Sequence, residues 1–138
     1  GRRGSHRMIK IKKEIIDQLF AHARKDLPIE ACGYLAEKDG VVCEHFEMTN
    51  TDQSPEHFSL DPKEQFTVLK KSRELGLNIR GVYHSHPSTP ARPSEEDIKL
   101  AFDPSVSYVI MSLIDPEIAI KSFRIEDGQV DPEPIQII

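Results

Sequence analysis

Three stretches of the chain are expected to be helices. Residues 13–25 repeat apolar side chains at the spacing of one helical face, at Ile15, Ile16, Leu19, Phe20 and Ala23. A second helix is expected from Asp61 to about Leu75, because an aspartate cap and a first-turn proline precede it and Gly76 follows it. A third is expected over residues 94–102.

Shorter apolar segments separated by turn residues predict strands. Residues 31–37 and 41–48 flank Lys38-Asp39-Gly40 and are expected to form a hairpin. The other expected strands cover residues 8–11, 57–60, 78–85, 106–113 and 118–125, the last two joined by Asp115-Pro116. Pro132 and Pro134 confine the tail, residues 129–138, to a sheet edge or an irregular stretch. This order of elements predicts an α+β fold, with a mixed sheet flanked by helices.

Length and composition indicate one domain without a membrane span. The chain has 138 residues, and no apolar run approaches the ~20 residues that cross a bilayer. Residues 1–7 are polar and look like an expression-tag remnant, which leaves residues 8–138 as the domain. Cys32 and Cys43, with no signal-peptide pattern before them, favour free thiols and a cytoplasmic location, and a disulfide between neighbouring strands stays the alternative.

The charge balance argues against a nucleic-acid partner. The 18 basic and 23 acidic residues give a formal net charge of −5. Without Arg2, Arg3 and Arg7, the 15 remaining basic residues give −8. A nucleic-acid-binding surface would instead show a basic patch.

Candidate chemistry is concentrated in residues 84–97. The apolar residues before His84 are typical of a strand, so His84 and His86 project from one face of its carboxyl end. With a carboxylate from Asp97, they would leave one position of a tetrahedral ion open, as a catalytic zinc site requires.

Ser94 and Asp97 also resemble a capping box at the start of the third helix, although that motif prefers Glu or Gln in its last position. The two interpretations are compatible, because a cap would fix the helical turn that carries Asp97. Negative charge is also favoured at a helix N-terminus.

The stretch resembles the JAMM, or MPN-plus, metalloprotease family. The family motif is an upstream glutamate, then His-Ser/Thr-His-Pro, six residues, Ser, two residues and Asp. Residues 84–97 match it in residue type and spacing, and Glu30 in Glu-Ala-Cys-Gly stands at the place of the upstream glutamate. Without the resemblance, the residues alone do not distinguish Glu30 from Glu37, Glu44 or Glu47.

The resemblance implies a curved, cytidine-deaminase-like sheet wrapped by helices, with zinc at one edge. His84, His86 and Asp97 would bind Zn²⁺, and water would take the fourth position. Glu30 would act as general base and then general acid, and Ser94 would donate a hydrogen bond to the oxyanion.

Glu-Ala-Cys-Gly and Ala-Arg-Pro-Ser, residues 91–94, are similar to segments of sulfur-carrier–cysteine hydrolases in particular. This implies a zinc peptidase that cleaves an amide bond at the C-terminal Gly of a small ubiquitin-like sulfur-carrier protein. The Gly-Gly tail would bind extended, adding to a sheet edge beside the zinc.

Three alternatives stay open. One is an isopeptidase that removes ubiquitin-like modifiers from protein lysines. Another is a non-catalytic binding scaffold, although such members usually lack the metal ligands. The third is a DNA-repair-associated relative, which normally has Asn between the two histidines, where this chain has Ser85. The sequence predicts no oligomeric state.

Overall fold

The computed structural model describes residues 8–114 and 119–138. The predicted tag remnant, the Asp115-Pro116 link and Ile118 lie outside the described residues. Strands and helices are β1 (Ile9–Ile11), α2 (Lys13–Lys25), β2 (Cys32–Lys38), β3 (Val41–Met48), α3 (Pro62–Glu74), β4 (Asn78–His86), α4 (Glu95–Lys99), β5 (Ser107–Ser112), β6 (Ile120–Glu126), β7 (Gln129–Glu133) and β8 (Ile135–Ile137).

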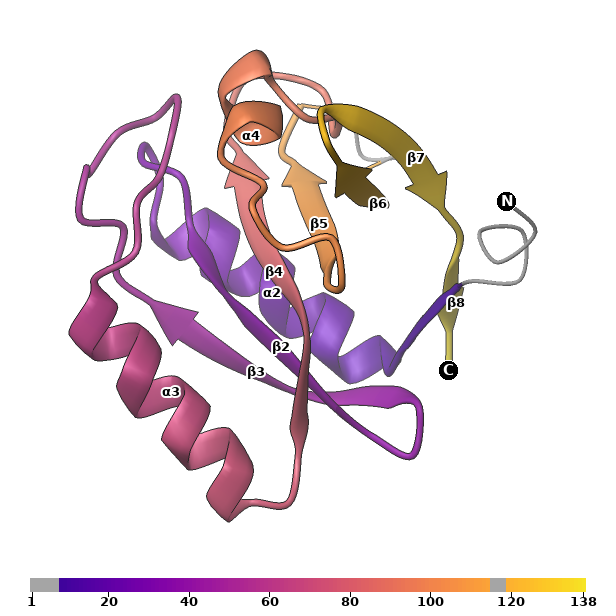
Figure 1. Cartoon of the computed structure of the whole chain (residues 1–138). Helices are drawn as coiled ribbons and strands as arrows, with labels where there is room; N and C mark the ends of the chain where they lie inside the picture. The colour runs from indigo at the N-terminus through magenta and orange to yellow at the C-terminus, as the bar shows by residue number, and fades with distance from the viewer. Residues whose placement is uncertain (1–7, 115–118) are drawn as a thin grey trace.

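The strands form one mixed sheet in the order β7-β6-β5-β4-β2-β3-β1-β8. β2 pairs antiparallel with both β3 and β4, whereas β4 and β5 are parallel. β7 and β8 occupy the two opposite ends of this order, yet only Pro134 separates them along the chain. The sheet therefore curls until its edges meet, and Ile9 N–H donates to the Pro134 carbonyl at 3.0 Å (Figure 1). The tail lies at the edges of the sheet, as its prolines predict.

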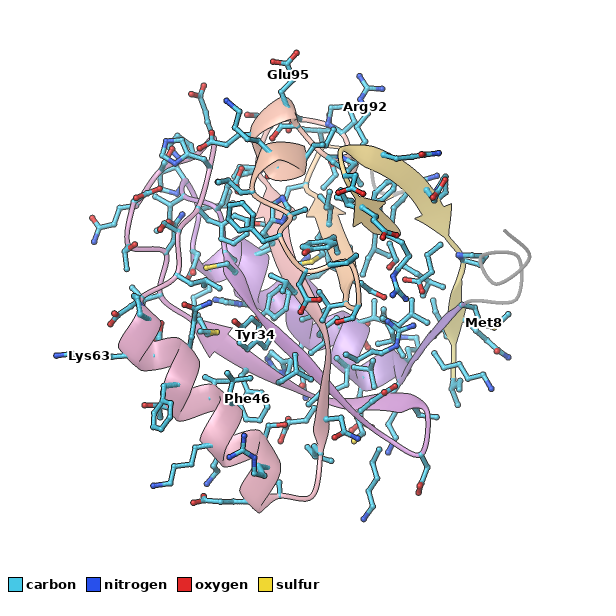
Figure 2. The ribbon with its side chains drawn as sticks, in the orientation of Figure 1. Met8, Tyr34, Phe46, Lys63, Arg92 and Glu95 are labelled. Atoms are coloured by element: carbon cyan, nitrogen blue, oxygen red, sulfur yellow. The ribbon has the colours of Figure 1, made fainter. Side chains whose placement is uncertain are left out.

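Alternation along the strands divides the core between two faces of the sheet. On one face, α2 packs against a cluster that includes Leu35, Tyr83 and Val109. On the other face, α3 covers Tyr34 and Met48, and residues in and just after α4 cover Ile110, Phe123 and Ile125. Figure 1 shows α2 behind the sheet and α3 and α4 in front of it. In Figure 2, Tyr34 and Phe46 lie between α3 and the sheet.

Two predictions of secondary structure are wrong: the strand at residues 57–60 and the length of the third helix. Residues 57–60 are not a strand, because Ser59 N–H donates to the Asn50 side chain and Ser59 O accepts from Thr51. These backbone groups are therefore bonded to the preceding loop and not to the sheet. The third helix ends at Lys99 instead of residue 102. Leu100 and Phe102 are 48% and 81% exposed, so no core burial stabilises another turn.

Gly33 allows the close approach that holds β4 against α2. Gly33 pairs with Tyr83, and a Cβ at Gly33 would lie 2.7 Å from the Tyr83 ring and would overlap the Phe46 carbonyl. The fully buried Tyr83 hydroxyl is 2.8 Å from Nδ1 of His22 on α2. The absence of a side chain at Gly33 thus makes room for the Tyr83 ring between the sheet and α2. Tyr83 directly precedes His84 along β4.

We expect Gly33→Ala to lower the free energy of unfolding by about 3 kcal/mol, because a methyl group there would overlap a carbonyl and a packed ring. Urea denaturation measures the effect. Gly40→Asn is the control, since Gly40 lies in an open turn with φ of +83°, a region that Asn tolerates. Equal, small losses in both variants would contradict the packing argument.

Candidate metal and active site

Three potential metal ligands converge at the carboxyl end of β4. His84 Nε2 and His86 Nε2 are 3.1 Å apart. The Asp97 Oδ2 atom lies 3.1 Å from the first and 3.2 Å from the second. Among the described residues, no other set of three His, Cys, Asp or Glu side chains is close enough to share one ion.

The spacing of these atoms fits a tetrahedral metal. Ligands about 2.0–2.2 Å from zinc stand roughly 3.3–3.5 Å from one another, so the cluster needs only small adjustments to hold an ion. Two imidazole nitrogens and one carboxylate oxygen also suit a borderline-soft ion and leave one position for water or substrate.

The tautomer of His86 is set by its neighbour. The His86 Nδ1 atom lies 2.8 Å from the Pro90 carbonyl, and a carbonyl can only accept. Nδ1 therefore carries a proton, and Nε2 is the nitrogen that faces the cluster and would bind a metal. Burial lowers the pKa of His84. Burial also opposes the charge on His86, but the hydrogen bonds to Asp97 and to the Pro90 carbonyl raise the pKa of His86.

Asp97 is held by the capping box that its spacing from Ser94 predicts. Ser94 Oγ accepts from Asp97 N–H at 3.0 Å, and Ser94 N–H donates to Asp97 Oδ2 at 2.9 Å. Burial opposes ionisation of Asp97, but the hydrogen bonds to His84 and His86 hold its pKa well below the usual range. The predicted cap and the predicted ligand are therefore one arrangement, and the Ser94 hydroxyl proton stays available for donation.

The pairing of β2 with β4 places Glu30 beside the cluster. Cys32 pairs with His84, so continuing the antiparallel register by two residues sets Glu30 opposite His86. Two bonds extend the register: Ser85 N–H donates to the Ala31 carbonyl at 2.9 Å, and Ala31 N–H to Ser85 Oγ at 2.8 Å.

Glu30 has the environment of a proton carrier and is not part of the three-ligand cluster. Its side chain is buried, and Oε1 has no hydrogen-bond partner. Burial raises the pKa of Glu30 to about 8, with His86 acting to lower it and Asp97 to raise it. A carboxyl group poised near neutral pH can accept and return a proton.

A pocket of about 270 Å³ opens beside the cluster. His84 and Asp97 line it together with apolar side chains, among them Phe58, Leu60 and Leu100. Phe58 stacks on the His84 ring, with centroids 4.7 Å apart. In Figure 2, Glu95 and Arg92 point outward from the α4 end of the molecule.

The expectation that substrate adds to a sheet edge beside the metal ligands stays a prediction, and the strand that carries the histidines is not itself such an edge. β4 is hydrogen-bonded on both sides, by β2 and β5, and the sheet edges are β7 and β8. A pocket lies beyond the strand end, between residues 57–60 and α4.

The structure brings together all five residues of the predicted site, and it gives contacts there to three others to which the sequence assigned no role. Phe58 covers His84, Ser85 bonds to Ala31, and Asn50 Nδ2 donates to the Glu30 carbonyl at 3.1 Å. Strand alternation was the available signal for Ser85, because it turns the serine away from the histidines.

Residues 12–126 match the family model described as prokaryotic homologues of the JAB domain. This chain belongs to the prokaryotic JAB-domain family. It is 38% identical to the CysO-cysteine peptidase of Mycobacterium tuberculosis, over 99% of this chain and 96% of the relative. It is 30% identical to a probable TtuB-protein conjugate cleaving protease of Thermus thermophilus, over 86% and 77%.

A solved structure supports the fold of this JAB-domain chain. The solution structure of protein DSY2949 from Desulfitobacterium hafniense is 49% identical, with a TM-score of 0.87 over 95% of this chain and 93% of that one. The predicted JAMM-type domain, α+β fold and hydrolase class are confirmed by these comparisons. Within the described ranges, no helix is long and apolar enough to span a membrane.

We expect Glu30→Gln to stabilise the metal-free protein at neutral pH. An unperturbed glutamate has a pKa of 4.5, whereas burial raises the pKa of Glu30 to about 8 in the folded chain. As the pH rises through this window, the unfolded chain releases the proton before the folded one, so the wild type loses stability that the amide keeps.

The difference in unfolding free energy should be about 1–3 kcal/mol near pH 7.5 and close to zero below pH 4.5. Urea titrations in chelator at both pH values measure it, with exposed Glu56→Gln as control. A stability gap that did not change with pH would refute the assignment.

Proposed function

We propose that this JAB-domain protein is a zinc peptidase that cleaves the amide bond after the C-terminal Gly of a small ubiquitin-like sulfur-carrier protein. The convergence of His84, His86 and Asp97 within 3.2 Å carries the proposal. The substrate class is supported by the name of the M. tuberculosis relative, a CysO-cysteine peptidase. Because both cysteines are free thiols, we assign the reaction to the reducing cytoplasm.

His84, His86 and Asp97 would hold the zinc, which when bound polarises a carbonyl and lowers the pKa of water to about 7. Glu30 Oε1 takes the proton of the attacking water, because it is buried, unpartnered and adjacent to His86. The same carboxyl group then gives that proton to the leaving amine.

Ser94 donates a hydrogen bond from its hydroxyl group to the developing oxyanion. Its Oγ already accepts from Asp97 N–H, which fixes the oxygen and leaves the proton free to point outward. A donor of this kind is typically worth about 10²–10³ in rate.

A second candidate, an isopeptidase acting on lysine-linked conjugates, is favoured by the conjugate-cleaving relative. The chain's residues would perform the same proton transfers on either bond, so only the leaving group separates the two. The scaffold alternative is disfavoured by the complete ligand set and by the unpartnered Glu30 carboxyl group, which a binding module does not require.

We expect one zinc ion per chain in the wild type and binding weakened about 100-fold or more in His86→Ala, since one of three protein ligands is lost. Metal analysis after dialysis, followed by a competition titration, measures both values. His45→Ala is the control, because His45 lies on β3 outside the cluster. Equal zinc content in the two variants would remove His86 from the site.

We expect cleavage of a ubiquitin-like carrier that ends in Gly-Gly-Cys, detected by mass as loss of the terminal cysteine. Glu30→Gln should retain zinc and lose about 10²–10⁴ in rate, because only proton transfer is removed. A carrier joined through Gly-Gly to a lysine side chain is the parallel substrate. Cleavage of the lysine-linked substrate alone would favour the isopeptidase, and near-normal turnover in Glu30→Gln would reject Glu30 as the base.

A further inference from the structure

The side chain of Asn50 is a buried junction between two parts of the site. It is 3% exposed and lies just after β3, where the chain leaves the sheet. Its amide nitrogen donates to the carbonyls of Glu30 at 3.1 Å, His57 at 3.0 Å and Ser54 at 3.4 Å. Its Oδ1 accepts from Asp52 N–H at 3.0 Å and Ser59 N–H at 3.3 Å. One amide group therefore satisfies backbone atoms from three parts of the chain.

The first part is the backbone of Glu30. While its carbonyl accepts from Asn50, its N–H donates to the Ser54 carbonyl at 2.9 Å. The next residue, Ala31, is bonded through both N–H and carbonyl to Ser85 on β4. The Glu30 carboxyl group itself has an unpartnered oxygen, so its position depends on these main-chain bonds and on packing.

The second part is the segment that carries Phe58. Asn50 binds the carbonyl before Phe58 and the N–H after it, so it fixes the backbone on both sides of the ring. That ring stacks on His84 and forms a wall of the adjacent pocket.

We propose that Asn50 is a positioning residue that holds the Glu30 carboxyl group and the Phe58 pocket wall in fixed relation to the metal ligands. The proposal rests on the proposed function and adds a positioning residue to that site. Displacement of a reacting group by about 1 Å can cost about 10²-fold in rate, so a shared anchor for base and pocket wall affects turnover directly. Asn50 touches no ligand and acts only through Glu30 and Phe58.

The Asn50 side chain has a donor group, Nδ2, and an acceptor atom, Oδ1. Substitutions that remove one or both can separate positioning of Glu30 from loop stability. Asn50→Asp keeps the shape and the acceptor oxygen, but it replaces the donor with an oxygen that faces three carbonyls. Asn50→Ala removes both the donor and the acceptor without adding charge. It is the variant to test if Asn50→Asp does not fold. Thr51→Ala is the matched control, because Thr51 lies in the same loop and its hydroxyl bonds to Ser59 O without touching Glu30.

In a folded Asn50 variant we expect kcat to fall about 10–100-fold while the zinc content per chain is unchanged. KM should rise a few-fold because the pocket wall is displaced, and Thr51→Ala should stay within about twofold of the wild type in both constants. Loss of loop stability alone would lower kcat equally in the Thr51 and Asn50 variants. That result, or a wild-type kcat in both Asn50 variants, would overturn the proposal.

Amide hydrogen exchange tests the positioning without turnover. We expect exchange at Glu30 and Ser59 to accelerate in the Asn50 variants more than in Thr51→Ala, with β4 unaffected. If the wild type cleaves no carrier conjugate, the proposed function fails and this exchange pattern alone decides the positioning of Glu30. Unchanged protection at Glu30, or global unfolding of both Asn50 variants, would overturn it.

Discussion

The site depends on the antiparallel register of β2 and β4. Cys32 opposite His84 fixes Glu30 opposite His86, and a shift of one residue would turn the histidines or the glutamate to the other face of the sheet. The register is held by more than ladder hydrogen bonds. The Tyr83 ring fits only over Gly33 and reaches His22 on α2, and Ser85 bonds to Ala31 in both directions. Packing on the face away from the cluster therefore sets the geometry of the cluster.

The requirements of folding stability and of the proposed chemistry agree at Asp97 and conflict at Glu30. At Asp97 they coincide, because the hydrogen bonds that cap α4 also aim the carboxylate at the histidines. At Glu30 they conflict, because a buried oxygen without a partner destabilises the fold while burial raises the proton affinity of the carboxyl group. The surrounding main-chain bonds to Ser54, Asn50 and Ser85 offset that cost locally.

Sequence patterns predicted most of the fold and selected four of the five candidate residues that the structure brings together, for identifiable reasons. Helix α2 has an uninterrupted apolar face, and the His-x-His pair and the Ser-x-x-Asp cap are local, so a short window contains their geometry. The choice of Glu30 came from resemblance alone, because its place is set by a strand pairing in which the bonded residues are 54 positions apart.

The errors also have physical causes. Residues 57–60 have the composition of a strand, but the Asn50 side chain bonds to their backbone groups. No pattern within residues 57–60 shows that an amide from the preceding loop will do so. The third helix was predicted too long because Phe102 is apolar, yet its side chain is exposed and is not buried in a core.

The closure of the sheet makes the strand that carries the histidines an interior strand. Because β7 and β8 follow each other across Pro134 while standing at opposite ends of the sheet, the edges meet away from the cluster. The strand that carries the histidines is central and paired on both sides, so no further strand can add to it where the chemistry occurs. The pocket lies past the strand end, between the Phe58 segment and α4. Residues 57–60, which are not a strand, thus line this pocket, and their backbone is bonded to the buried amide of Asn50 that also bonds to Glu30.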